Sequence, residues 1–219
     1  AGGNWLAQVE WVAKVVEHVA ASASGKASIE QSPAQEVPLP PDSADALVTD
    51  PPYYDAFGYS DLSDFFLSWH RRHMPESSLS RLTFSEKGTA PKKLEIVVNP
   101  SAEKDGRGPK DANWFESQMS VTFAKAREVV KPEGIAVIVF AHKQTSGWEA
   151  LLSSVINSGW IVSGSWPIDT ERPARQRAQD SAALASSIHL VCRPRENPDG
   201  SVRTDEIGDW RDVLAELPK

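Results

Sequence analysis

The residues whose types most clearly suggest a chemical role are Asp50, Pro51, Pro52 and Tyr53, which follow the apolar run at 46–48 after one threonine. An exocyclic amine on a base is a poor nucleophile until two acceptors hold its N–H groups and turn its lone pair toward an electrophile. The Asp50 carboxylate and the Pro51 carbonyl would be those acceptors. Proline has a fixed φ and no N–H group, so the two prolines hold their carbonyls stiffly and add no competing donor.

Aromatic residues in and after this motif indicate a flat substrate. We expect Tyr53 to stack on the base, a contact worth roughly 1–3 kcal/mol. A base in a duplex must first be flipped out, at a cost of a few kcal/mol. Tyr54 and Phe57 follow in the same loop and are candidates for further nucleic-acid contacts. Asp and Pro are also common in ordinary turns, but the strand before the motif and the helix after it favour the catalytic interpretation.

Hydrophobic periodicity predicts the elements that position the motif. Helices are expected at 5–21, 62–69, 111–130 and 147–157. Strands are expected at 27–30, 45–49, 135–140, 160–166 and 186–192. These elements belong to a catalytic region over residues 1–195, in which the polar stretch 75–110 is expected to be a flexible insertion. Residues 196–219 are expected to form an acidic C-terminal tail helix.

This order of elements indicates the α/β class. The sheet is expected to be Rossmann-like, mostly parallel and incomplete, with an antiparallel hairpin at its C-terminal end. The unbroken apolar run at 135–140 is typical of a strand buried on both faces. Ligands of such sheets bind outside the carboxyl ends of the strands, and Asp50 is placed at one such end.

The composition is that of an ordinary globular protein: 219 residues, 40% hydrophobic, with a net charge of −7 and one cysteine. No apolar stretch reaches the ~20 residues that span a membrane, and no signal-peptide pattern is present. We therefore expect a cytoplasmic protein with no membrane partner. The single Cys192 excludes an internal disulfide and a cysteine-rich zinc site within this sequence, and the spacing of the histidines predicts no metal site.

The negative charge is unevenly distributed. Residues 1–70 carry a net charge of −8, whereas residues 71–110 carry +4 and residues 171–195 carry +3. Backbone phosphates are contacted by local basic surface, so both basic stretches are compatible with a nucleic-acid partner. Arg172, Arg175 and Arg177 are the candidate phosphate contacts. A solvated loop in which neighbouring acids neutralise these arginines is an equally good interpretation.

The chain resembles a known enzyme family. The order of the motif, two helices, a Lys-Pro-Glu-Gly turn, a strand and a closing hairpin looks like the catalytic half of class I S-adenosylmethionine-dependent methyltransferases. More narrowly, the stretches at 8–13, 48–59, 166–171 and 181–187 are similar to bacterial adenine-specific DNA methylases that carry a zinc ribbon. The resemblance implies methylation of an exocyclic amine in DNA at adenine N6, and a role in restriction–modification or phage defence.

The resemblance also implies the site residues. Asp50, Pro51, Pro52 and Tyr53 would be catalytic, and S-adenosylmethionine would be the cofactor. The segment Gln31, Ser32, Pro33 and Ala34 would border the cofactor's adenine, with Asp50 also in contact with the cofactor.

One family feature has no counterpart in this sequence. The Phe-x-Gly-x-Gly loop, which binds the methionine part of the cofactor, does not occur. A start at Ala1 instead of Met is typical of a fragment, so we expect an N-terminal segment of a longer enzyme as a partner. Two alternatives stay open: an RNA base amino-methyltransferase, and a non-catalytic nucleic-acid-binding or scaffold module without the cofactor loop.

Overall fold

The computed structural model describes residues 4–22, 25–80, 82–102, 108–169, 186–197 and 199–202. The chain divides into two compact units, residues 1–30 and residues 31–219. The first unit contains α1 (Trp5–Ser22), in which no residue is buried. The side-chain oxygen of Asn4 accepts a hydrogen bond from the Ala7 amide at 2.8 Å, as an N-cap residue does. This helix was predicted at 5–21, whereas the strand predicted at 27–30 is wrong, because those residues are irregular.

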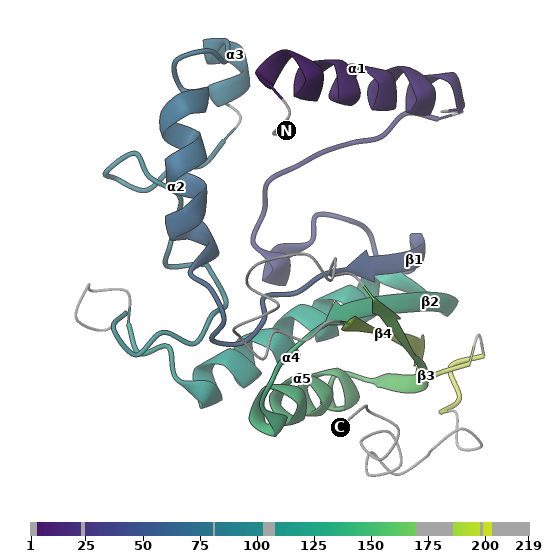
Figure 1. Cartoon of the computed structure of the whole chain (residues 1–219). Helices are drawn as coiled ribbons and strands as arrows, with labels where there is room; N and C mark the ends of the chain where they lie inside the picture. Colours follow the sequence, from purple (N-terminus) through teal and green to yellow (C-terminus); the bar gives the residue numbers. More distant parts are fainter. Residues whose placement is uncertain are drawn as a thin grey trace. The chain divides into compact units, whose positions relative to one another are not determined.

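The second unit is built on a four-stranded sheet in the order β1-β2-β4-β3 (Figure 1). Strand β1 (Ala44–Thr49) pairs in parallel with β2 (Val130–Phe140). Strand β4 (Ser186–Pro194) pairs antiparallel with both β2 and β3 (Trp160–Asp169). The α/β class and the antiparallel C-terminal hairpin are confirmed, and the parallel part of the described sheet is the β1–β2 pair.

Gly134 lets β1 and β2 approach closely where their register shifts. Ala44 pairs with Val130 and Ala46 with Ile135, so extra residues of β2 are accommodated between these positions. A Cβ atom on Gly134 would lie 2.5 Å from Cγ1 of Val130. Only glycine fits here without a shift in its neighbours. The turn predicted at this point is thus built into the start of β2.

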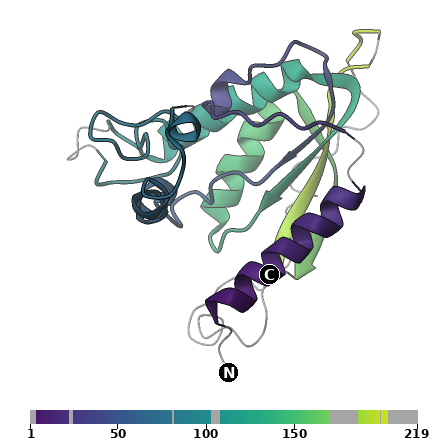
Figure 2. The same cartoon turned by 90° about the horizontal axis from the view of Figure 1, so that it is seen from above.

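Two helices, α4 (Ala112–Val129) and α5 (Thr145–Asn157), pack against each other and on one face of the sheet (Figure 2). The Asp111 carboxylate accepts a hydrogen bond from the Trp114 amide and caps α4. The core between helices and sheet contains fully buried side chains from both layers, among them Phe115, Phe123, Ile138, Leu151 and Leu190.

Strand β2 is buried on one face within the described part of the chain. Ala136, Ile138 and Phe140 are fully buried toward the helices, whereas Val137 and Val139 are half-buried. The prediction of burial on both faces is therefore wrong for the described structure, because the two covering helices lie on the same side.

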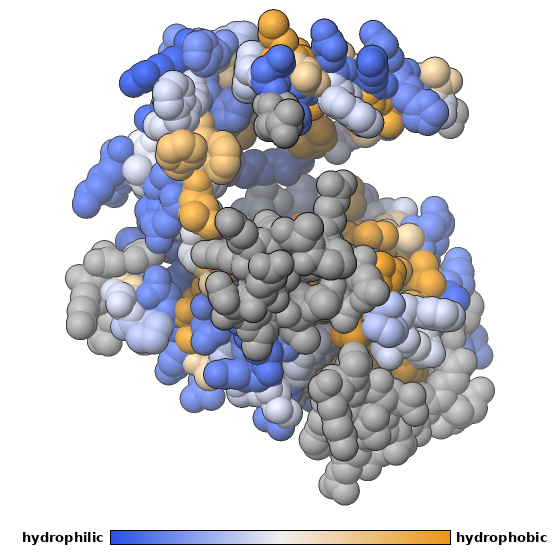
Figure 3. Space-filling model, in the orientation of Figure 1, coloured by the Kyte–Doolittle hydropathy of each residue, from blue (hydrophilic) through white to orange (hydrophobic). Residues whose placement is uncertain are grey.

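Helix α2 (Tyr59–His70) follows the motif, as predicted, and precedes the short α3 (Glu76–Leu79). Its apolar stripe stays on the surface, where hydrophobic side chains are visible in Figure 3. The stripe consists of residues that are more than half exposed: Leu62, Phe65, Phe66 and Trp69.

The polar stretch predicted as an insertion makes specific contacts with α2 and with the core. Lys92 Nζ lies 2.6 Å from both Asp61 Oδ1 and Asp64 Oδ2. Ile96 is buried and belongs to the core. The predicted flexibility of this stretch stays a prediction. The tail helix predicted over 196–219 lies mostly outside the described residues, which end at Val202. The described residues of the tail are not helical, and Glu196 and Val202 form an isolated β-bridge.

Candidate active site

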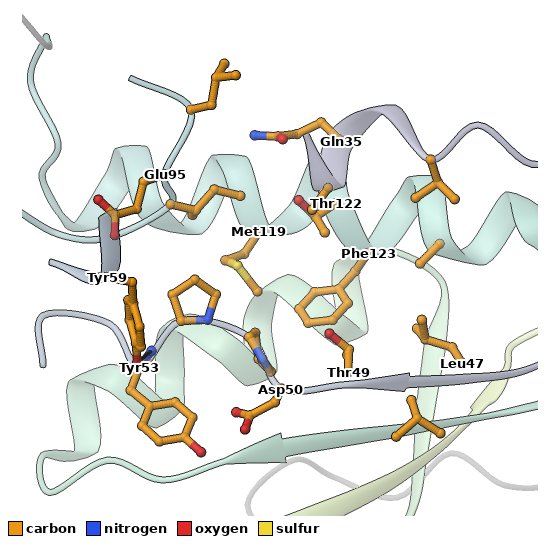
Figure 4. Close-up of a pocket in the computed structure, with 18 of the residues that line it drawn as sticks. Gln35, Leu47, Thr49, Asp50, Tyr53, Tyr59, Glu95, Met119, Thr122 and Phe123 are labelled. Atoms are coloured by element: carbon orange, nitrogen blue, oxygen red, sulfur yellow. Dashed lines mark hydrogen bonds between the residues drawn. The ribbon is translucent and has the colours of Figure 1, made fainter. Parts of the chain in front are cut away.

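A pocket of about 720 Å³ opens at the carboxyl end of β1 (Figure 4). Its walls come from the motif, the 3-10 turn η1 (Ala34–Glu36), helix α4 and residues 94–96. The volume lies within the range of small-molecule sites. Apolar side chains dominate the walls, with Leu47, Met119 and Phe123 among them.

Asp50 stands where the sheet topology favours ligand binding. Thr49, the last residue of β1, pairs with Ile138 of β2 in the parallel register. Asp50 is therefore the first residue beyond a parallel strand, at the carboxyl edge. It is exposed and lines the pocket, whereas Pro51 beside it is buried. The predicted catalytic residues Asp50, Pro51, Pro52 and Tyr53 all line this one pocket.

Tyr53 lies beside Asp50 on the wall of the pocket. Burial raises the pKa of Tyr53 well above its usual value, and the nearby Asp50 carboxylate raises it further. The Tyr53 side chain is therefore a neutral phenol at neutral pH. Its ring also contacts Phe140 edge to face, with the ring centroids 5.6 Å apart.

Tyr59 completes the motif loop and was not predicted as a site residue. Its hydroxyl oxygen accepts a hydrogen bond from the Tyr53 amide at 3.3 Å, and its side chain lines the pocket. Burial raises the pKa of Tyr59, so it too is a neutral phenol. Phe57, predicted to contact nucleic acid, lines the pocket beside Tyr59 with a ring-centroid distance of 5.9 Å. The aromatic type of Tyr59, shared with its neighbours in the motif loop, was the available signal in the sequence.

Tyr54, also predicted to contact nucleic acid, has its ring turned to other parts of the protein. The ring packs edge to face on Phe115 at 5.1 Å and on His142 at 5.4 Å. The backbone at Tyr54 has a φ of 52°, in the left-handed region, which is uncommon for a bulky residue. The chain turns here, so that the Tyr53 side chain lines the pocket whereas the Tyr54 ring packs on Phe115 and His142. The geometry gives no support to a nucleic-acid contact by Tyr54.

Of the segment predicted to border the cofactor's adenine, Ala34 lines the pocket. Gln31 is engaged elsewhere, since its Oε1 accepts a hydrogen bond from the Thr83 amide at 2.7 Å. Ser32 is exposed and Pro33 is half-buried, and neither lines the pocket. Gln35, which sequence reasoning missed, does line it.

Gln35 carries an unusual polar atom. Its Nε2 donates to Oε1 of Gln118 on α4 at 3.1 Å. Its own Oε1 is buried and has no hydrogen-bond partner within the described part of the protein. Buried acceptors are nearly always paired, so this oxygen calls for an explanation.

His142 ties the motif loop to the end of β2. Its Nε2 lies 3.0 Å from Oδ1 of Asp55, and its Nδ1 lies 3.2 Å from the Gln144 amide nitrogen, which donates to it. Nδ1 also lies 3.0 Å from the Gln144 carbonyl oxygen, so both ring nitrogens of His142 are engaged by neighbouring polar groups.

The remaining predicted contacts are not gathered at this site. Arg172, Arg175 and Arg177 lie outside the described residues. No cluster of three or more metal-ligating side chains occurs in the part of the chain that the structure describes. Among the helices described there, none is long and apolar enough to cross a membrane.

The sequence matches no family model and no curated protein. Among solved structures, a candidate DNA modification methylase from Thermus thermophilus is similar at 13% identity with a TM-score of 0.40, over 87% of this chain and 61% of that one. Its complex with S-adenosyl-L-methionine matches at 15% identity and a TM-score of 0.36, over 86% and 62%. The antibiotic-resistance methyltransferase Kmr matches at 11% identity and a TM-score of 0.26, over 78% of this chain and 96% of that one.

These likenesses are weak, with TM-scores of 0.40 or below, and carry no argument about the site. The chain spans about 61% of the length of the first of these proteins.

Proposed function

We propose that this chain holds and activates an exocyclic base amine for methylation, as part of an S-adenosylmethionine-dependent DNA methyltransferase acting at adenine N6. The observation that supports this most is the position of Asp50. It lies at the carboxyl end of a parallel strand, on the wall of a pocket large enough for a purine and beside the neutral phenol of Tyr53.

The motif supplies two acceptors for the amine. A carboxylate has about four lone-pair sites, so the Asp50 side chain is the first acceptor for an amine N–H. The Pro52 carbonyl already accepts from the Tyr54 amide at 3.0 Å. The Pro51 carbonyl is therefore the second acceptor of the proposal, held rigid by the ring that follows it.

The residues of the pocket fit an adenine-bearing cofactor. Leu47, Met119 and Phe123 give the wall apolar surface, and one buried acceptor of the wall, Gln35 Oε1, lacks a donor among the described residues. Bound S-adenosylmethionine would supply an electrophilic methyl group. Asp50 and the Pro51 carbonyl would hold the two N–H groups of the amine so that its lone pair faces that methyl group. The Asp50 carboxylate would also accept the proton that the amine loses on methylation.

A direct test removes the acid. Asp50→Ala leaves no side-chain acceptor for the amine N–H at this position. We expect incorporation of labelled methyl groups into DNA to fall on the order of 100-fold or more, since misplacement of reacting atoms alone has that effect. Asp45→Ala is the matched control, because Asp45 is an exposed acid of the preceding strand, paired with Lys131 at 2.6 Å. Near-normal transfer by Asp50→Ala would rule out the proposed role of Asp50.

A second candidate is a nucleic-acid-binding module without catalysis. The observation that favours it is that no glycine is among the described residues lining the pocket, so a loop for the methionine part of the cofactor is not provided there. Calorimetry with S-adenosylhomocysteine separates the two candidates, since micromolar binding is incompatible with the second. Comparing labelled DNA and RNA in the same assay decides the substrate.

A further inference from the structure

Gln35 is held in one orientation by α4. Its Nε2 donates to Gln118 Oε1 at 3.1 Å. The Gln118 backbone carbonyl accepts from the Thr122 hydroxyl at 2.9 Å, so the hydroxyl of Thr122, which also lines the pocket, is engaged within the helix. What remains unpaired, among the described residues, is the buried Gln35 Oε1. An unpaired buried acceptor is costly and points to a donor that a ligand brings.

We infer that Gln35 Oε1 accepts a hydrogen bond from the 6-amino group of the cofactor's adenine and makes the pocket selective for 6-aminopurines. The inference rests on the proposed function. Gln35 comes from η1 and is tied to α4, whereas Asp50 follows β1, and the two lie on different sides of the pocket (Figure 4). Asp50 and Gln35 therefore serve two different amines, that of the target base and that of the cofactor.

The walls near Gln35 suit the rest of a purine ring. Ala34 and Val37 flank it on the side of η1, and Phe123 and Ala126 line the pocket from α4. These side chains offer apolar contact and no hydrogen-bonding groups. The Thr122 hydroxyl donates its proton within α4, so the acceptor that lacks any partner among the described residues is the Gln35 side-chain oxygen.

Gln118 fixes which end of the Gln35 amide faces the ligand. A 6-oxopurine presents an acceptor to Gln35 Oε1, and two acceptors repel. Gln35 could present its Nε2 to such a ligand only by rotating its amide, which would turn Oε1 toward Gln118 Oε1 and break the hydrogen bond at 3.1 Å. Gln118 is thus a positioning residue, and a site built around a hydrogen bond rejects the analogue that cannot make it.

The test measures binding, by calorimetry, of two probes: S-adenosylhomocysteine and its 6-oxo analogue S-inosylhomocysteine. The unmodified chain is expected to bind S-adenosylhomocysteine about tenfold more tightly than S-inosylhomocysteine, because one hydrogen bond has an effect of about this size. Gln35→Met keeps the length of the side chain and is expected to remove the preference. Gln118→Leu is expected to weaken it, whereas Gln118→Glu, which can only accept, is expected to retain it.

Gln31→Met is the matched control, since Gln31 bonds the Thr83 amide and does not line the pocket. It is expected to keep the full preference, and thermal melting checks that every variant folds. Equal binding of both probes by the unmodified chain, or an intact preference in Gln35→Met, would overturn the inference and leave the proposed function standing. No binding of either probe would overturn both. If Gln35→Met instead altered only the choice between adenine and hypoxanthine in DNA, the amine would be that of the target base, and the inference would be wrong.

Discussion

The imidazole Nε2 of His142 lies 3.0 Å from Oδ1 of Asp55. This contact joins the end of β2 to the loop that carries Asp50 and Tyr53, across 87 positions of sequence. The His142 side chain is nearly buried and the Asp55 side chain half exposed. The conformation of the motif loop thus depends on the neighbouring strand as well as on its own prolines.

This contact predicts an energetic coupling between the two residues. We expect the loss of unfolding free energy in the double variant His142→Ala/Asp55→Ala to be smaller than the sum of the single losses, by about 0.5–1 kcal/mol. Urea denaturation of the four proteins measures it. Asp61→Ala combined with His142→Ala is the control and is expected to be additive, since Asp61 pairs with Lys92 instead. Additivity in the first pair would show that the contact contributes nothing to stability.

Gly147 is expected to be essential for the position of His142. A Cβ atom there would lie 2.3 Å from His142 Nδ1 and 2.5 Å from its Cγ. The ring is rigid and nearly buried, so Gly147→Ala must displace it. We expect a loss of about 1–3 kcal/mol in unfolding free energy, as overpacking causes. Gly164→Ala in β3 is the control, because a Cβ there would meet its nearest neighbour, Trp166 Nε1, at 3.6 Å, an ordinary contact.

The Asp64–Lys92 contact predicts how stability changes with pH. Burial raises the pKa of Asp64, but hydrogen bonds from the Ala90 amide and from Lys92 outweigh it and leave the pKa below its usual value. The ionised form therefore favours folding. This contribution is fully present above about pH 4, the pKa of a free Asp, and is lost as the pH falls through the lower folded value.

Asp64→Asn is therefore expected to destabilise the protein by about 1 kcal/mol at pH 7 and by progressively less toward pH 2. Urea denaturation across this range, compared with the exposed Glu86→Gln, gives the measurement. If the loss of unfolding free energy in Asp64→Asn stayed constant from pH 7 to pH 2, the contact would not be ionic. Burial lowers the pKa of Lys92, but its hydrogen bonds to Asp61 and Asp64 raise it overall. The contribution of the charged Lys92 to stability is therefore kept at neutral pH and is lost only as the pH rises through the pKa of Lys92 in the folded protein.

Local pattern was enough to predict most elements of the fold. The helix expected at 111–130 is α4 at Ala112–Val129, because its apolar spacing and the Asp111 cap are both visible in the sequence. The start of α2 was missed by three residues, since it begins at Tyr59. There the Ser60 amide donates to Glu95 Oε1 at 2.9 Å, from 35 positions away, and periodicity does not encode such a partner.

The site was predictable in its chemistry and less so in its contacts. Asp50 and the two prolines after it were predicted as site residues because their chemistry follows from their residue types. Gln35 and Tyr59 were missed, since each acts through a contact that folding creates, with Gln118 on α4 and with the Tyr53 amide. The 3-10 turn at Ala34–Glu36 also moves the pocket border past Gln31, to Ala34 and Gln35.

Cys192 gives a sensitive test of the packing of β4. Its side chain is fully buried in the core, and burial raises the pKa of its thiol to about 12. Because the thiolate is the reactive form, the folded protein is expected not to react with a maleimide at pH 8 over the time in which the urea-unfolded protein reacts completely. Partial urea concentrations should expose the thiol only along with the loss of circular dichroism. Rapid labelling in buffer alone would mean that β4 opens locally, without global unfolding, and that the β2–β4 pairing is weaker than the buried core implies.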